Sequence, residues 1–248
     1  LALLFLLVAL LSGMRIAFAT AFCGFIGLWV LRGYSPAATL SSMIPHGHLA
    51  VYPLLVLPLF IMMGYFAFYA GITKNLYWAA RQWLGHLPGG LAIATIFGSA
   101  GFAAACGAST ASAAVMGRVA LPELKRFGYD DKVSAGCVAA GGTMATMIPP
   151  SVLLVMYGFI AEESIGVLLL AGFLPGLLEA FSYSLLLFFR FKINPALGPP
   201  APKVSWPGRL QSIKGVWGMI TLIVLVMGSI YTGIATPTEA AAVGAGGA

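Results

Sequence analysis

The sequence predicts an all-α polytopic membrane protein, and three observations lead to this fold class. Apolar residues make up 60% of the 248 residues, whereas charged residues make up 8%. The mean hydropathy of +0.97 is too high for a domain whose surface must meet water. The apolar residues also gather in runs that approach the roughly 20 residues needed to cross a bilayer as a helix.

Seven stretches are apolar enough to be predicted as transmembrane helices. The first, LALLFLLVALLSG, is not preceded by basic residues and is followed by Arg15, so a span fits better than a signal peptide. The chain ends within an apolar pattern, and we expect it to lack a C-terminal half. The predicted spans are residues 1–13, 15–31, 50–70, 131–160, 164–189, 212–231 and 236 onward.

Residues 73–86, TKNLYWAARQWLGH, are too polar to span a bilayer. Apolar side chains alternate here with Lys74, Arg81 and Gln82. This pattern predicts an amphipathic helix lying in the membrane interface, with an ordinary connecting helix as the alternative.

Residues 88–120 are apolar and rich in small residues, with the polar string CGASTAS at 106–112 near the middle. A single helix of this length would overshoot the bilayer. Two half-spans that meet at the polar string would fit, so we predict a re-entrant hairpin with its tip at mid-membrane.

The span 131–160 contains GGTMATMIPPS at 141–151, with paired glycines before paired prolines. Proline removes a backbone donor, and glycine lowers the cost of leaving the helix. The sequence therefore predicts a helix that is broken within the membrane.

The basic residues fix the predicted orientation. If Arg118, Lys125, Arg126 and Lys132 are cytoplasmic, 12 of the 13 Lys and Arg residues lie inside and Arg32 lies outside. This topology places the N-terminus and the stretch 41–53 on the outer face. We expect His46 and His48 to lie there in a solvated loop, since no third metal ligand is near.

Several function classes are disfavoured by the sequence. Cys23, Cys106 and Cys137 have no zinc or disulfide spacing. The net charge of +6 is better explained by membrane orientation than by nucleic-acid binding. Motifs of serine hydrolases, zinc proteases, P-loop enzymes and intramembrane aspartyl proteases are absent, so we do not expect an enzyme.

The two interruptions carry the candidate chemistry. Unsatisfied backbone groups cost several kcal/mol in lipid, so broken backbone at this depth must be buried in protein or line a cavity. Ser109, Thr110, Ser112 and Thr143 supply neutral oxygens suited to sodium, and neither stretch contains a carboxylate. The alternative is that these small residues only allow close helix packing.

Two glutamates lie in predicted spans. Glu179 is well inside 164–189, where a charge is expensive and often functional; the alternative is a carboxyl group hydrogen-bonded to a neighbouring helix. Glu239 lies near the start of the last span, where Thr236 or Thr238 is expected to cap the helix and Pro237 is tolerated.

Residues 104–178 resemble the hairpin-to-helix core of the large permease subunit of tripartite ATP-independent periplasmic (TRAP) transporters, which belong to the ion transporter superfamily. The strings AACGASTASAAVMGRVALPELKRFGYDD and AAGGTMATMIPPSVLL carry this resemblance, and LPGGLAIAT at 87–95 and TPTEAAAVGA at 236–245 are similar to other signatures of the family. The order of these strings matches that of the family along essentially the whole chain.

The resemblance implies an inverted-repeat elevator transporter, of which this chain holds one full repeat. It implies five parts: scaffold helices at 1–72, an arm helix at 73–87, a transport-domain core at 88–163, a span with a basic connector at 164–210, and the start of a second repeat at 211–248. It also implies sodium as the coupling ion, with no other cofactor, and a bacterial or archaeal inner-membrane location. The implied partners are a periplasmic substrate-binding protein, a small four-helix membrane subunit and the lipid bilayer, and the implied substrate is an organic acid such as a C4-dicarboxylate or a sialic acid.

The resemblance further implies the residues of the site. The sodium site would use Cys106, Gly107, Ser109, Ser112, Gly142, Ala145, Ile148 and Pro150. The substrate would lie beside Ser109, Thr110, Thr143 and Pro149. Cys106 and Ala108 stand where the family commonly has serine, and a thiol is a poor sodium ligand.

Two other functions stay open at this point. One is a sodium or proton symporter of the same superfamily that needs no binding protein. The other is a structural membrane subunit without an ion site.

Overall fold

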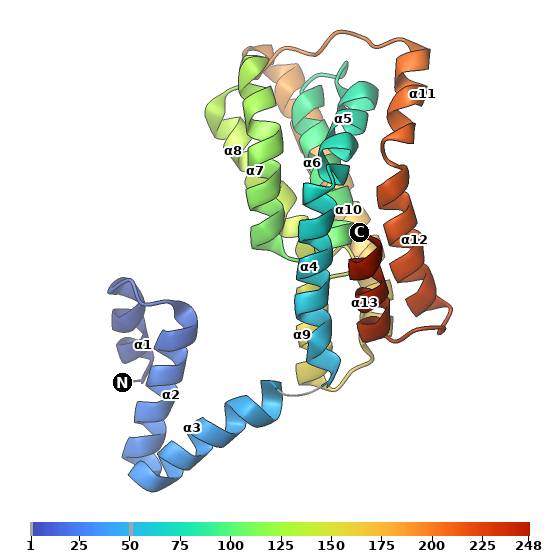
Figure 1. The fold of residues 1–248 in the computed structure, drawn as a ribbon. Helices are drawn as coiled ribbons and strands as arrows, with labels where there is room; N and C mark the ends of the chain where they lie inside the picture. The colour runs from blue at the N-terminus through green and yellow to red at the C-terminus, as the bar shows by residue number, and fades with distance from the viewer. Residues whose placement is uncertain (1, 50–51) are drawn as a thin grey trace. The chain divides into compact units, whose positions relative to one another are not determined.

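The computed structural model describes residues 2–49 and 52–248, and these residues form helices without a β-strand. The predicted all-α class is therefore confirmed. The chain divides into two compact units, residues 1–52 and residues 53–248 (Figure 1).

The first unit holds three helices, α1 (Ala2–Leu11), α2 (Ile16–Arg32) and α3 (Tyr34–Leu49). The third helix was not predicted. The prediction of a loop at 41–53 is wrong for residues 41–49, which are helical. Pro36 falls in the first turn of α3, where its missing N–H has no helical partner to lose. His46 and His48 thus lie within the helical backbone of α3, and their side chains are outside the described structure.

The second unit begins with two helices that meet at a sharp bend. A 3₁₀ turn, η1 (Tyr52–Leu55), leads into α4 (Val56–Tyr69), and α5 (Ile72–Leu84) follows at a bend of 66°. Gly71 lies at the bend with φ +80°, a conformation that favours glycine. The bend separates the apolar stretch from the amphipathic stretch, and α5 buries Tyr77 and Ala79 as it packs on α6 (Gly90–Cys106).

The predicted hairpin consists of α6 and α7 (Ser109–Arg126), which pack against each other and are joined by Gly107 and Ala108 (Figure 1). Its second arm is longer than expected, because α7 continues beyond residue 120 through Pro122 to Arg126.

The predicted break in the next helix is also present. Asp130 caps α8 (Asp131–Thr143) by accepting hydrogen bonds from two backbone amides of its first turn. A short 3₁₀ turn, η2 (Met144–Thr146), and an irregular segment at 147–151 follow, and α9 (Val152–Ala161) resumes the path.

The remaining helices close the second unit. The expected cap of the last one is confirmed, since Thr236 and Glu239 form a capping box. Their bounds are α10 (Ile165–Ile193), η3 (Pro195–Leu197), α11 (Trp206–Lys214), α12 (Trp217–Tyr231) and α13 (Pro237–Gly247).

One helix among the described residues, α10, is long and apolar enough by itself to cross a membrane. The bent pairs α4 with α5 and α11 with α12 reach that threshold when each pair is taken as one span. Leu170, Leu174 and Phe181 are among many large apolar side chains that α10 exposes. A surface of this kind suits contact with lipid better than contact with water.

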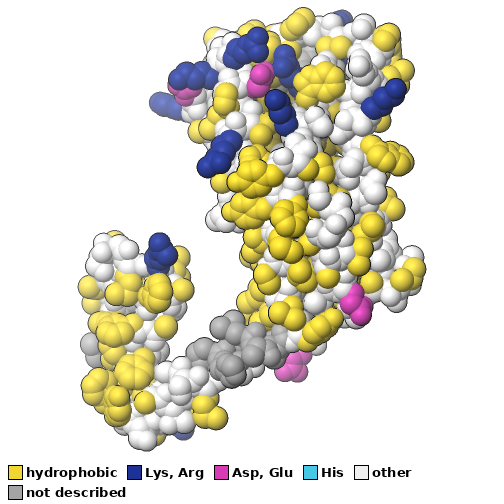
Figure 2. All heavy atoms as spheres, in the orientation of Figure 1, with side chains coloured by type: hydrophobic (Ala, Val, Ile, Leu, Met, Phe, Trp, Pro, Cys, Tyr) yellow, Lys and Arg dark blue, Asp and Glu magenta, His cyan; other side chains and the backbone are white. Residues whose placement is uncertain are grey.

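Charge is distributed unevenly over the second unit. Eleven of the 13 Lys and Arg residues belong to it, and the other two are Arg15 and Arg32. Figure 2 shows Lys and Arg side chains of the second unit around the end that carries α5 and the C-terminal part of α7, with acidic side chains both among them and at the opposite end. The positive-inside rule counts Lys and Arg alone, so their gathering at one end is the feature that bears on the predicted orientation, which stays a prediction.

Candidate functional site

The two interrupted stretches meet in the second unit. The backbone N–H of Val152, at the start of α9, donates to the carbonyl of Gly107 at the hairpin tip over 3.0 Å. This bond joins residues 45 positions apart, and it ties the tip directly to the far side of the break.

Gly107 is required by this arrangement for two reasons. Its φ of +65° lies in the left-handed region that L residues with a side chain rarely adopt. A Cβ atom at this position would also collide with the carbonyl oxygen of Pro150. The tip therefore lies in backbone-to-backbone contact with the broken segment.

Glycines allow two further close approaches around the break. A Cβ on Gly142 would lie 2.8 Å from the Cβ of Ala113 and 3.2 Å from the carbonyl oxygen of Ser109. On the other side, a Cβ on Gly176 of α10 would lie 2.6 Å from a side-chain carbon of Ile148. The broken segment is thus enclosed by α7 and α10.

Four helix ends converge in this region. α6 ends at Cys106 and α8 ends at Thr143, while α7 begins at Ser109 and α9 begins at Val152. Helix C-termini carry partial negative charge and favour cations, whereas N-termini carry partial positive charge and favour anions. No side chain caps the N-terminus of α7, but Ser151 caps α9 by accepting from the Leu154 N–H.

The hydroxyl groups differ in their bonding. The Oγ of Ser112 is fully buried and has no hydrogen-bond partner, and the same is true of Ser99 beside Gly141. Buried polar groups normally have partners, so an unpaired one marks a position where a ligand can bind. Of these two serines, Ser112 is the one in the first turns of α7, next to the hairpin tip.

A carboxylate lies beside the break, contrary to the expectation from the two stretches alone. The hydroxyl of Thr143 donates to Oε1 of Glu179 on α10 over 3.0 Å and to the carbonyl of Ala140 over 2.7 Å. The alternative given for Glu179, a hydrogen bond to a neighbouring helix, is the one observed. Glu179 is 36 residues from Thr143 in the sequence, so it lies outside the two interrupted stretches from which a neutral oxygen site was predicted.

The structure brings most of the predicted site residues together at this junction. Thr110 is exposed in the first turn of α7, whereas Ala145, Ile148 and Pro149 are buried in and around the broken segment. Cys106 is the exception among the side chains. Its thiol packs toward α4, where a Cβ on Gly64 would lie 2.7 Å from its Sγ, so only the Cys106 backbone faces the junction.

Ser99 and Ser151 were missed by the sequence reasoning. Ser151 follows Pro149 and Pro150 and precedes an apolar run, which is a recognisable helix-cap signal. Its hydroxyl also donates to the carbonyl of Thr146 over 2.7 Å, and this hydrogen bond links the end of η2 to the start of α9. Ser99 lies within an apolar helix and has no comparable signal.

Comparison with known proteins gives one consistent result. The family described as "Tripartite ATP-independent periplasmic transporter, DctM component" matches residues 3–248.

Among the described residues, no group of three His, Cys, Asp or Glu side chains could hold a metal ion.

Three curated relatives illustrate the range of this similarity. The C4-dicarboxylate TRAP transporter large permease protein DctM of Pseudomonas aeruginosa is 38% identical over 195 residues, which is 78% of this chain and 45% of the relative. The sialic acid TRAP transporter large permease protein SiaM of Vibrio cholerae is 31% identical over 94% of this chain and 54% of its own length. The ectoine TRAP transporter large permease protein TeaC of Halomonas elongata is 30% identical over 76% of this chain and 44% of its own length. The chain thus spans about half the length of the curated relatives it matches.

Proposed function

The chain belongs to the DctM component family of TRAP transporters, and from this premise we propose that the protein containing it is a large membrane permease subunit that takes up an organic acid together with sodium. Relatives are named for C4-dicarboxylate, sialic acid and ectoine transport. Within this range we propose a C4-dicarboxylate or sialic-acid-like substrate for the present protein.

The observation that carries the proposal is the junction between the hairpin tip and the broken helix. Interrupted helices at membrane depth are where secondary transporters bind substrate and coupling ions. Here the tip and the break are joined by the hydrogen bond between Val152 and Gly107, and an unpaired buried hydroxyl, Ser112, lies in the next turn.

Cation and anion would use adjoining parts of this junction, with Ser109 common to both. The carbonyls at the C-terminal ends of α6 and α8, together with Ser109 and Ser112, suit sodium because it prefers several oxygen ligands. The uncapped N-terminus of α7, at Ser109 and Thr110, suits the carboxylate of an organic acid. Thr143 and Pro149 lie next to both.

The proposed transport cycle is an elevator movement of the hairpin and the broken helix. Buried residues of α6, α7, α8 and η2 share one continuous apolar core, which also includes residues of α5 and α10, so we expect these elements to move together. One elementary charge that falls through 100 mV supplies about 2.3 kcal/mol, so two or more sodium ions can drive uptake without ATP.

The proposed setting is a bacterial or archaeal inner membrane, with Lys and Arg of the second unit on the cytoplasmic side. The proposed partners are a periplasmic substrate-binding protein, which delivers the organic acid, and a small four-helix membrane subunit. No nucleic acid takes part.

Uptake into proteoliposomes tests this function. The full-length permease with its small subunit is expected to take up labelled substrate only when an inward sodium gradient and the binding protein are both present. Undiminished uptake without the binding protein would indicate an independent symporter. No uptake, together with a melting temperature that ignores sodium, would indicate a structural subunit.

The hydroxyls of the hairpin are tested by changing Ser109 and Ser112 to Ala together. A hydroxyl bound to a charged group contributes about 1.5–3 kcal/mol, so loss of one ligand lowers the apparent sodium affinity about 10- to 100-fold and loss of both lowers it further, while membrane insertion is normal. The matched control changes Ser182 and Thr221 to Ala, since both hydroxyls bond only to their own helices. Unaltered sodium affinity in the first variant would remove this tip from the cation site.

A further inference from the structure

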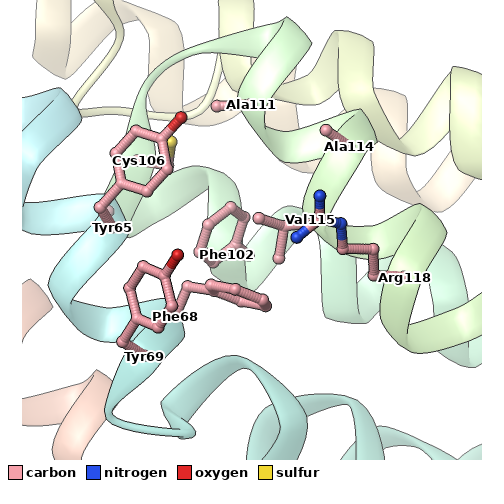
Figure 3. A pocket seen from close by; sticks show the side chains of 10 residues that line it. Tyr65, Phe68, Tyr69, Phe102, Cys106, Ala111, Ala114, Val115 and Arg118 are labelled. Atoms are coloured by element: carbon pink, nitrogen blue, oxygen red, sulfur yellow. The ribbon is translucent and has the colours of Figure 1, made fainter.

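A groove runs along the second unit from the hairpin toward the end where basic residues gather. Its first part is a cavity of about 100 Å³ between α4 and the hairpin, lined mainly by apolar and aromatic side chains (Figure 3). Tyr65, Phe68 and Tyr69 come from α4, and Phe102 and Val115 come from the hairpin. Tyr65 and Tyr69 are exposed, so the groove is open on one side.

The second part is a cavity of about 340 Å³ between α5 and α7. It is lined by Lys74, Trp78, Arg81 and Glu123 among others, and it shares Arg118 with the first cavity. Figure 3 shows the Arg118 side chain turned back along α7 toward Val115. An apolar groove and a basic pocket therefore join at one arginine.

Two of the three cations in the basic pocket have no acidic partner. A guanidinium nitrogen of Arg81 lies 2.9 Å from a carboxylate oxygen of Glu123, and the guanidinium carbon lies 4.7 Å from the centre of the Phe127 ring. The only other ion pair in the described part of the chain, from Arg126, uses the same carboxylate. Lys74 and Arg118 are thus left with uncompensated positive charge.

The position of Arg118 along α7 bears on what its charge can bind. Arg118 is exposed and lies nine residues from the start of α7, which is about 13 Å along the helix axis. With the hairpin tip at mid-membrane, as predicted, this distance brings Arg118 close to the edge of a hydrocarbon core about 30 Å thick, where anionic headgroups lie. The occupant of the pocket should therefore be an anion.

We propose that this groove binds an anionic phospholipid, with the phosphate held by Lys74 and Arg118 and one acyl chain lying along the aromatic groove. Basic pockets between membrane helices bind anionic headgroups, and aromatic side chains such as Trp78 favour the membrane interface. A small organic acid fits this groove poorly, since its walls are apolar beyond Arg118. The site lies on the α4 and α5 side of the hairpin, so it is separate from the junction at the broken helix.

The test uses the full-length permease in neutral detergent, titrated with phosphatidylglycerol or phosphatidylcholine while its apparent melting temperature is recorded. Phosphatidylglycerol is expected to raise the melting temperature, and phosphatidylcholine is not. In the double variant Lys74→Gln with Arg118→Gln, about 30-fold more phosphatidylglycerol should be needed, which corresponds to about 2 kcal/mol for two charges. The single variant Lys74→Gln should need about 5-fold more.

The matched control changes Lys125 and Lys203 to Gln, which removes two exposed charges that line neither cavity. It should respond to phosphatidylglycerol as the unmodified protein does. Equal weakening in both double variants would overturn the proposal. Stabilisation by inorganic phosphate or by succinate alone, equal to that by the lipid, would also overturn it and would indicate a site for a free anion.

The acyl-chain part has its own variant. Ala114 lies on the exposed side of α7 and lines the apolar cavity, so Ala114→Phe should fill the groove. This variant is expected to weaken binding of long-chain phosphatidylglycerol but to leave binding of a short-chain analogue unchanged. Unchanged binding of both would remove the acyl chain from this groove.

Discussion

The contact between the hairpin tip and the broken helix can be tested at one atom. Replacing Gly107 by Ala adds a single methyl group at the point where the tip touches Pro150. The change leaves the charge and every hydrogen-bonding group in place. Its effect therefore reports the closeness of the two backbones.

The expected cost has two parts. An L residue with a side chain in the left-handed conformation costs about 1–2 kcal/mol. The new Cβ also collides with the carbonyl oxygen of Pro150, a backbone atom that cannot rotate away. Overpacking of this kind costs about 1–3 kcal/mol, so the total for Gly107→Ala is about 2–5 kcal/mol.

Gly128→Ala is the matched control. Gly128 has φ +74°, close to that of Gly107, but its Cβ would meet nothing within 4 Å. The substitution Gly128→Ala should therefore cost only the conformational part, about 1–2 kcal/mol of the free energy of unfolding. Apparent melting temperatures of the two full-length variants in detergent, with and without sodium, provide the measurement.

Gly107→Ala is expected to melt below Gly128→Ala and to lose part of the stabilisation by sodium, because the tip moves away from the break. Equal melting temperatures for the two variants would show that the tip does not lie against Pro150. Equal stabilisation by sodium would separate the contact from the proposed cation site.

Three further substitutions test single contacts through the apparent melting temperature. Tyr129→Phe removes the hydroxyl that accepts a hydrogen bond from the buried Leu91 N–H over 3.3 Å, and should lower the free energy of unfolding by about 1–3 kcal/mol. An unchanged melting temperature would contradict this role of the hydroxyl. Glu179→Leu removes one of the two acceptors of the Thr143 hydroxyl, which still has the Ala140 carbonyl, and should cost at most about 0.5–1.5 kcal/mol; Glu179→Gln keeps a carbonyl oxygen and should cost less, and the reverse order would refute the bond. Ser112→Ala removes an unpaired buried hydroxyl, so without sodium the protein should be as stable or more stable by up to about 1–3 kcal/mol, and a lower melting temperature would show an overlooked partner.

The family and the fold class followed from the sequence because they depend on local chemistry. The break at 144–151 and the hairpin tip at Gly107 and Ala108 lie where Gly, Pro and small polar residues interrupt apolar runs. Gly71 likewise lies at the bend between α4 and α5, where the sequence changes from apolar to amphipathic. These residues act through their own backbone angles and missing donors, so their neighbours in space are not needed to interpret them.

The sequence reasoning failed where polar composition was taken as a loop. Residues 34–49 mix apolar with polar side chains and contain Pro36 and Pro45, yet they form α3. A proline in the first turn costs no hydrogen bond, so it did not exclude a helix there.

What the sequence determined by itself was most of the helices, the two interruptions and the gathering of positive charge in the second unit. Only the tertiary structure decided that Gly107 meets Pro150, that Glu179 of α10 accepts a hydrogen bond from Thr143, and that the Cys106 thiol packs toward α4. The physical reason is that backbone preference is a property of a few adjacent residues, whereas these contacts join positions 36 to 43 apart and depend on how whole helices pack.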